Sequence, residues 1–296
     1  MLSNPRGLRG MSSIMTMKAW PEKINSYDDI PKVFKDFFYQ RDEKFPYTVY
    51  IPANSTLLKK RNEKLLSLYD DSLSVLVNTK DGVIEKKCSF DEISYIEKVS
   101  ILMMGKLKIF GEISVSLYFN TMGDKVFNKI ITAIRNYLSQ DKKFSQKNED
   151  EKELLEILGK NNLKYLNSIM ELIQNEATVH SVLFQPEVRK KVIQKRGEKT
   201  IFKYIASHVT VLTSSEIIHI REEKSKSMTL KTSYGTVSLI IPLEKINHVE
   251  LNKDEKEELK RLIVDIEGTH NLEFHFDIAN EKVEDFASMC NTIIKN

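Results

Sequence analysis

The sequence is poor in the residues that mark low-complexity and disulfide-rich proteins. Its 296 residues include only 10 glycines, 7 prolines and 2 cysteines. This composition, with 41% hydrophobic and 29% charged residues, is that of a globular chain long enough for two domains. Cys88 and Cys290 lie in distant, unrelated local sequences, so we expect a reducing cytosol and no disulfide.

Long apolar runs and a strong charge of one sign are also missing. No run approaches the roughly 18 apolar residues that a membrane-spanning helix needs. The 45 basic and 42 acidic side chains leave a net charge of +3, which is too small to indicate nucleic-acid binding. We therefore expect a cytoplasmic protein with no nucleic-acid partner. A peripheral position at the membrane is the alternative.

Motifs of catalysis and of metal or cofactor binding are absent as well. The sequence has no HExxH, CxxC, P-loop, GxGxxG or GxSxG pattern. Among the six histidines, His248 and His275 alternate with apolar residues, so we expect both to point outward from half-exposed strands. We expect no enzyme, metal site or cofactor, and no small-molecule substrate is indicated. A catalytic set scattered along the chain would leave no local motif, so that alternative stays open.

Residues 1–25 stand apart from the rest of the chain. The opening MLSNPRGLRGMSSIMTMKAW contains no acidic residue, and its apolar residues never gather into the core of a signal peptide. We interpret 1–25 as a disordered leader, an upstream start or an expression remnant. A transit peptide is the sharper alternative, although the glycines and proline there disfavour a helix.

An internal repeat dominates the remaining sequence. Each half begins with an amphipathic helix pattern, SYDDIPKVFKDFFYQ in the first and NNLKYLNSIMELIQN in the second. Their apolar faces are expected at Ile30, Val33, Phe34, Phe37 and Phe38, and at Leu163, Leu166, Met170 and Ile173. The repeat predicts one domain at 26–140, a linker with a helix at 141–160, and a second domain at 161–296.

Short strand patterns follow each helix in the same order. FPYTVYIP and TVHSVLFQP both end in proline, which cannot donate a hydrogen bond to a strand ladder. Hairpin turns are expected at Asp70-Asp71 and Ser214-Ser215. The halves realign at SFDEISYIE and PLEKINHVE, where the apolar positions match. Two more strands and an amphipathic helix, DKVFNKIITAIRNYL or EKVEDFASMCNTII, complete each half. The apolar stripe of the first of these helices is expected at Val126, Ile130, Ile134 and Leu138.

The repeated unit resembles bacterial pleckstrin-homology-like (PH-like) and GRAM-like domains. The likeness is carried by VTVLTSSEIIHI, IPLEKINHVE, RLIVDIEGTHNLEFHF and VEDFASMCNTII, and it covers 180–296 better than 47–139. It implies an α+β protein with two PH-like antiparallel β-rolls or barrels, each preceded by an amphipathic helix and closed by a C-terminal helix. The preceding helix either packs on the outer face of the sheet or joins the two units. Since this superfold hosts lipid, peptide and protein binders, it does not fix the ligand.

Basic residues follow the first strand of each half. They are Lys59, Lys60 and Arg61 in the first half, and Lys190, Lys191, Lys195 and Arg196 in the second. The resemblance implies a phosphate-gripping role, as in PH domains that bind phosphoinositides, most directly for Lys190, Lys191, Lys195 and Arg196. Clustered cations suit anionic headgroups, at roughly 1 kcal/mol for each basic residue near an anionic membrane. The alternative is a solvated loop, because Glu187 and Glu198 lie alongside.

An apolar run at Leu102, Met103 and Met104 has no counterpart in the second half, which carries the charged NKDEKEELK. A methionine-rich surface suits adaptable protein contacts, whereas burial of the run is the plainer alternative.

Overall we expect a non-catalytic binding or scaffolding protein that contacts a protein partner or a second copy of itself. The contact would use the extra helices, the sheet edges or this run. Peripheral binding to anionic lipid headgroups through the basic loops is the alternative.

Overall fold

The structure is a computed structural model that describes most of the chain. The described residues are 20–38, 44–56, 59–101, 104–139, 156, 158–159, 162–173, 177–193, 200–223, 235–255 and 257–295. The chain divides into two compact units, the first within Met1–Ile93 and Lys98–Tyr137 and the second within Ser94–Glu97 and Leu138–Asn296. The predicted boundaries of independent domains stay predictions. Within the described residues, no helix is long and apolar enough to cross a membrane.

The folded part of the first unit begins before the predicted boundary at residue 26. Strand β1 (Glu22–Ile24) pairs antiparallel with β2 (Tyr47–Ile51). These three residues, which the predicted leader included, therefore belong to the first sheet. Residues 1–19 of that leader lie outside the described residues.

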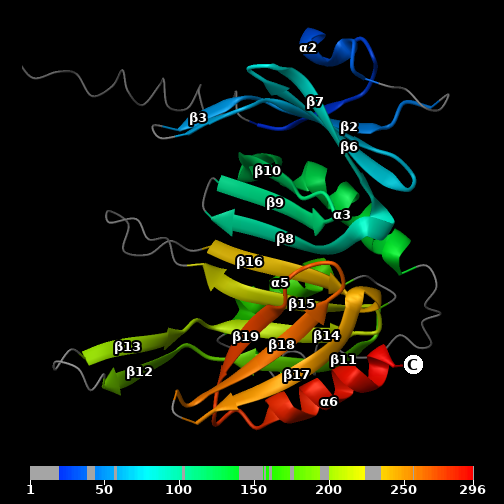
Figure 1. Ribbon diagram of the computed structural model, residues 1–296. Helices are drawn as coiled ribbons and strands as arrows, with labels where there is room; N and C mark the ends of the chain where they lie inside the picture. Colours follow the sequence, from blue (N-terminus) through cyan, green and yellow to red (C-terminus); the bar gives the residue numbers. More distant parts are fainter. Residues whose placement is uncertain are drawn as a thin grey trace, which may run out of the picture. The chain divides into compact units, whose positions relative to one another are not determined.

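The first unit contains a five-stranded antiparallel sheet, in the order β1-β2-β5-β6-β7 (Figure 1). Its last three strands are β5 (Lys64–Leu68), β6 (Ser72–Thr79) and β7 (Gly82–Ser89). Three more strands follow in the order β10-β9-β8: β8 (Ile93–Ile101), β9 (Met104–Gly111) and β10 (Val115–Asn120). The unit ends in helix α3 (Lys125–Leu138), whose predicted apolar stripe is buried at Ile130, Ile134 and Leu138.

The second unit repeats this arrangement. The strands β11 (Val179–Gln185), β14 (His208–Thr213), β15 (Glu216–Glu223) and β16 (Gly235–Pro242) lie in the order β16-β15-β14-β11. A second antiparallel sheet contains β17 (Ile246–Asp254), β18 (Leu259–Ile266) and β19 (Leu272–Asp277). Helix α6 (Lys282–Ile294) closes this unit as α3 closes the first.

The repeated segments SFDEISYIE and PLEKINHVE take the same structure in both units. Each begins with a short 3-10 helix, η1 (Phe90–Glu92) or η4 (Leu243–Lys245), that leads directly into a strand. The first residue of each 3-10 helix, Phe90 or Leu243, is buried. The polar residues differ because they contribute little to this shared core.

Two turns define the hairpins β5–β6 and β6–β7 of the first unit. The turn at Asp70-Asp71 connects β5 to β6, as predicted, and Leu68 pairs with Leu73 across it. The next hairpin turns at Gly82, whose φ of 118° is readily accessible only to glycine. In the second unit the predicted turn at Ser214-Ser215 connects β14 to β15.

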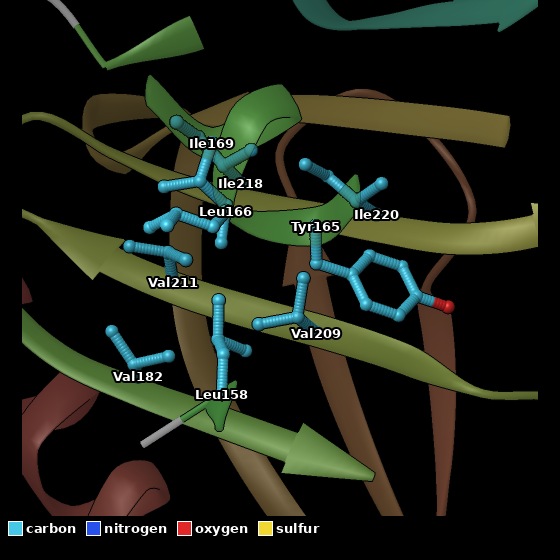
Figure 2. Close-up of a cluster of buried hydrophobic side chains, with 9 residues drawn as sticks. All are labelled: Leu158, Tyr165, Leu166, Ile169, Val182, Val209, Val211, Ile218 and Ile220. Carbon is cyan, nitrogen blue, oxygen red and sulfur yellow. The ribbon is translucent and has the colours of Figure 1, made fainter. Parts of the chain in front are cut away.

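Helix α5 (Leu163–Leu172) packs on one face of strands β11, β14 and β15, as the outer-face alternative predicts (Figure 2). The cluster contains Leu158, Tyr165, Leu166, Ile169, Val182, Val209, Val211, Ile218 and Ile220. The predicted apolar face was right at Leu166 and Ile173, which pack in this cluster, and wrong at Leu163 and Met170, which are 53% and 47% exposed. Tyr165 sets the actual phase: it is fully buried, and its hydroxyl donates a hydrogen bond of 2.6 Å to the carbonyl oxygen of Ser207.

The corresponding helix of the first unit is much shorter than predicted. Helix α2 (Lys32–Lys35) is a single turn that starts after Pro31, within the pattern predicted as a helix from Ser26 onward. Phe34 and Phe38 pack with Ile30 against Leu65 and Leu76 of the five-stranded sheet, whereas Phe37 is exposed. The segment thus packs by its aromatic residues, with little regular helix.

The described part of the chain is α+β with mainly antiparallel sheets, as predicted. The strand pairings of the described residues close neither unit into a barrel, so the two-barrel description is not confirmed. The basic hairpins form separate two-stranded sheets. The first, β3 (Asn54–Thr56) with β4 (Lys59–Arg61), lies in the chain between β2 and β5, and the second, β12 (Val188–Ile193) with β13 (Thr200–Ile205), lies between β11 and β14. The basic hairpins thus interrupt the main antiparallel sheets, and the candidate site lies at these hairpins.

Candidate functional site

Both basic segments form two-stranded ribbons at equivalent places in the repeat. The first consists of β3 (Asn54–Thr56) and β4 (Lys59–Arg61), and the second of β12 (Val188–Ile193) and β13 (Thr200–Ile205). Each ribbon follows a proline that ends the preceding main strand, Pro52 or Pro186. Because proline lacks the N–H donor, the chain leaves the main sheet at that point.

The structure places only some of the predicted anion-binding residues. Lys190 and Lys191 lie in β12, where Lys190 pairs by register with Lys203 of β13. Lys59 and Lys60 lie in β4, opposite Thr56 and Ser55. The described part of these four residues is the backbone, and Lys195 and Arg196 lie outside the described residues. Their role as phosphate ligands stays a prediction.

Arg61 is the predicted anion-binding residue whose side chain is described, and it has an intramolecular role. Its guanidinium carbon lies 4.0 Å from the centroid of the Tyr118 ring, and the residue is half-buried. Arginine stacks well on aromatic rings because its planar cation is weakly hydrated. This contact fixes the end of the first ribbon against β10.

The predicted interaction run at Leu102, Met103 and Met104 is mostly outside the described residues. Met104 is the first residue of β9 and pairs by register with Asn120, while Leu102 and Met103 are not described. Whether the run forms an interaction surface stays a prediction.

A network of charged and aromatic side chains fixes the base of the second ribbon. The carboxylate of Glu187 accepts a hydrogen bond of 3.1 Å from Arg189 Nε and one of 2.8 Å from the hydroxyl of Tyr204. Arg189 and Tyr204 are also direct cross-strand partners. The ribbon therefore leaves the sheet in a defined direction, although it pairs with no further strand in the described part of the chain.

A cavity of about 520 Å³ lies at this base, wholly within the second unit. Its apolar wall is formed by Val182, Phe184, Pro186 and Val188, at the junction of β11 and β12. Its polar wall is formed by Asp277, Asn280, Glu281 and Lys282, where β19 leads into α6. An apolar pocket with a few polar groups at one side is typical of a binding site.

Gln185 connects the two walls of the cavity. It is only 1% exposed, and its side-chain oxygen accepts a hydrogen bond of 2.9 Å from the backbone N–H of Asp277. Asn280 Nδ2 donates to the carbonyl oxygen of Phe184 at 3.1 Å. The cavity is thus preformed by hydrogen bonds. The sequence did not predict these residues. Their only local signal is a glutamine directly before Pro186, and the burial of that glutamine cannot be inferred from the sequence.

The first turn of α6 is held beside the cavity by an ion-pair group. Glu284 binds Lys253 at 2.7 Å and the buried Lys260 at 3.0 Å, and Lys260 also donates to the carbonyl oxygen of Asn280. The hydrogen bond from Lys253 is the main cause that lowers the pKa of Glu284 to about 2. Glu284 therefore stays ionised and keeps the start of α6 fixed over β17 and β18.

Two histidines are buried between the sheets of the second unit. The ring of His219 stacks on Phe274 with 4.0 Å between centroids, and His208 packs edge-on to Phe276 at 4.8 Å. His219 Nδ1 lies 2.9 Å from Thr210 Oγ1, and His208 Nδ1 lies 2.9 Å from the carbonyl oxygen of Ala206. Nε2 of His208 has no hydrogen-bond partner among the described residues. Burial lowers the pKa of His208 to about 4 and lowers that of His219 as well. Both rings are therefore neutral core residues at neutral pH.

Other reactive groups also have structural roles. Burial raises the pKa of the free thiols of Cys88 and Cys290 to about 11 and about 12, so both stay protonated. His248 and His275 are exposed, as predicted from their alternation with apolar residues. Among the described residues, no three histidine, cysteine or acidic side chains are grouped so that they could hold a metal ion.

Neither a protein-family model nor a curated protein matches the sequence. The inference of function therefore depends on the ribbons and the cavity themselves.

Proposed function

We propose that this is a non-catalytic binding protein whose second unit holds an extended, acidic segment of a partner protein. The observation that supports this most is the ribbon β12–β13, which pairs with no third strand among the described residues and has an apolar cavity at its base. We further propose that both units are PH-like domains, on the strength of the repeated order of strands and closing helix.

An unpaired strand edge offers a row of backbone donors and acceptors. A partner segment in extended conformation could pair with such an edge and gain main-chain hydrogen bonds, while pockets for its side chains supply specificity. Strand β13 approaches β19, so the outer edge of β12 is the side that remains for such pairing. The ribbon is six residues long on each strand, which is enough for this kind of pairing.

The cavity supplies the anchor that backbone pairing lacks. Val188 is both the first residue of β12 and part of the cavity wall, so a strand laid along β12 would pass the cavity entrance. An apolar side chain of the partner could enter there and displace water from Phe184 and Pro186. The basic residues of β12, Arg189, Lys190 and Lys191, favour acidic residues in the same segment.

The test is a substitution that places a charged side chain in the wall of the cavity. Val188→Glu should reduce capture of the partner from the native cell by at least about tenfold, because an unpaired carboxylate would oppose an apolar anchor. Ile84→Glu is the matched control, since Ile84 is an exposed strand residue of the first unit. Equal capture by both variants, quantified by mass spectrometry, would contradict the proposal.

Binding of anionic lipid headgroups is the second candidate, because basic ribbons occur at equivalent places in both units. Liposomes with and without phosphatidylserine distinguish it from protein binding. Salt-sensitive sedimentation that is lost in Arg189→Glu with Lys191→Glu, but kept in Lys87→Glu, would favour the lipid. Lys87 is exposed on β7 and belongs to neither ribbon.

A further inference from the structure

The first unit contains a groove of about 520 Å³ that has no part in the proposed binding of a protein segment. It lies at the start of β2 and the end of β5, whereas the basic ribbon follows the other end of β2. Its basic residues come from three separate segments: Lys23 from β1, Lys44 from the approach to β2, and Lys129 from α3. Tyr47 and Asp70 also line it.

Tyr47 is the fixed centre of this groove. Its hydroxyl donates a hydrogen bond of 2.9 Å to the carbonyl oxygen of Val126 in α3. Two of the lysines lie over its ring, with Nζ of Lys129 at 4.6 Å and Nζ of Lys23 at 5.8 Å from the centroid. One ring thus positions two ammonium groups that belong to elements far apart in the sequence.

The positive charge of the groove is poorly compensated. Within the described residues, none of the three lysines forms an ion pair, and Asp70 is the one carboxylate in the lining. Two ammonium groups held near one ring repel each other, and because all three lysines are exposed, water and salt screen part of this repulsion. An anion between them would remove the repulsion and accept hydrogen bonds from both.

We propose that this groove binds a phosphate monoester that also carries a hydroxyl group. The phosphate oxygens accept hydrogen bonds from Lys23, Lys44 and Lys129. The carboxylate of Asp70 accepts a hydrogen bond from the ligand's hydroxyl and disfavours anions that lack one. The same chemistry occurs in a free sugar or glycerol phosphate and in a lipid with a phosphomonoester headgroup.

This site is independent of the proposed partner binding, because every lining residue belongs to the first unit. Val188→Glu in the second unit should leave ligand binding at the groove unchanged. Conversely, loss of the groove lysines should leave capture of the protein partner unchanged.

The test is isothermal titration of the full chain with glycerol 3-phosphate. Lys129→Gln and Lys23→Gln should each weaken binding by about tenfold, since each removes a charged hydrogen bond to phosphate. Lys125→Gln, one turn earlier on α3, is the matched control and should bind like the unaltered protein. Thermal unfolding of each variant separates loss of binding from loss of folding.

Further comparisons identify the ligand. Asp70→Asn should strengthen binding of inorganic phosphate while reducing the preference for glycerol 3-phosphate over it. Vesicles of phosphatidylcholine with phosphatidic acid test the lipid source: sedimentation that needs Lys129 would place the headgroup in the groove, and its absence would assign the free ester. No binding of glycerol 3-phosphate or of these vesicles at millimolar concentration, or equal binding by the Lys125 and Lys129 variants, would overturn the proposal.

Discussion

At the scale of single residues, the environment of each histidine decides its role. His248 and His275 are exposed on strands, and alternation with apolar neighbours was enough to predict this. His208 and His219 lie in strands that are buried at almost every position, so alternation carries no signal there. Their burial depends on Phe274 and Phe276 of β19, which are distant in the sequence.

The buried histidines predict a loss of stability in mild acid. The pKa of His208 is about 4 in the folded chain against an ordinary 6.5, so between these values only the unfolded chain takes up a proton. The free energy of unfolding should therefore fall as the pH drops from 6.5 toward 4, by about 3 kcal/mol for this residue alone. Above pH 6.5 the ring is neutral in both states and contributes no pH dependence.

Thermal unfolding measured across this pH range checks the prediction. His208→Phe should flatten the acid limb, which is the fall in stability below pH 6.5, because it removes a ring that only the unfolded chain protonates there. A phenyl ring can pack on Phe276, and loss of the hydrogen bond of 2.9 Å between Nδ1 and the carbonyl oxygen of Ala206 lowers stability by the same amount along the neutral range. His248→Gln, at an exposed position, is the control, and its stability should fall in acid as steeply as that of the unaltered protein. An acid limb as steep in His208→Phe as in the unaltered protein would assign the loss to other groups.

At the scale of elements, periodicity located helices better than it located their buried faces. The stripe of α3 was predicted correctly because a regular run of isoleucines packs there. The face of α5 was predicted only in part, because the buried hydroxyl of Tyr165 finds its acceptor only in the folded unit. The helix expected from Ser26 onward is only one turn long in the structure. Phe34 and Phe38 pack against the sheet without a longer helix.

The corrected face of α5 gives a prediction for stability. Ile169→Ala should lower the free energy of unfolding by about 2 to 4 kcal/mol, because Ile169 is fully buried against the sheet. Leu163→Ala on the same helix should change it by less than about 0.5 kcal/mol, because that side chain is 53% exposed. Urea unfolding followed by circular dichroism measures both. The reverse order of effects would restore the face predicted from the sequence.

At the scale of the whole chain, the repeat was the feature that the sequence made most visible. Shared apolar positions such as Phe90 and Leu243 are buried in equivalent elements of the two units. The binding features were not predictable, because they differ between the copies and bring together distant residues. Val188 meets Asn280 at one cavity, and Lys23 meets Lys129 at one groove. No local motif encodes either pair.

The same contrast explains what each copy is proposed to do. The core is duplicated, whereas the cavity at the second ribbon and the lysine groove are each lined by residues of one unit. The two proposals assign a protein segment to the second copy and a small anion to the first.

Hydrogen exchange on the full-length protein, with and without the partner captured by the unaltered protein, tests the proposed partner site most directly. The proposal predicts slowed exchange of the backbone amides of β12, Val188–Ile193, and of the cavity wall at Asp277 to Lys282. Val188→Glu should abolish this protection, and Ile84→Glu should keep it. Protection that leaves β12 unchanged and appears elsewhere in the chain would contradict the account.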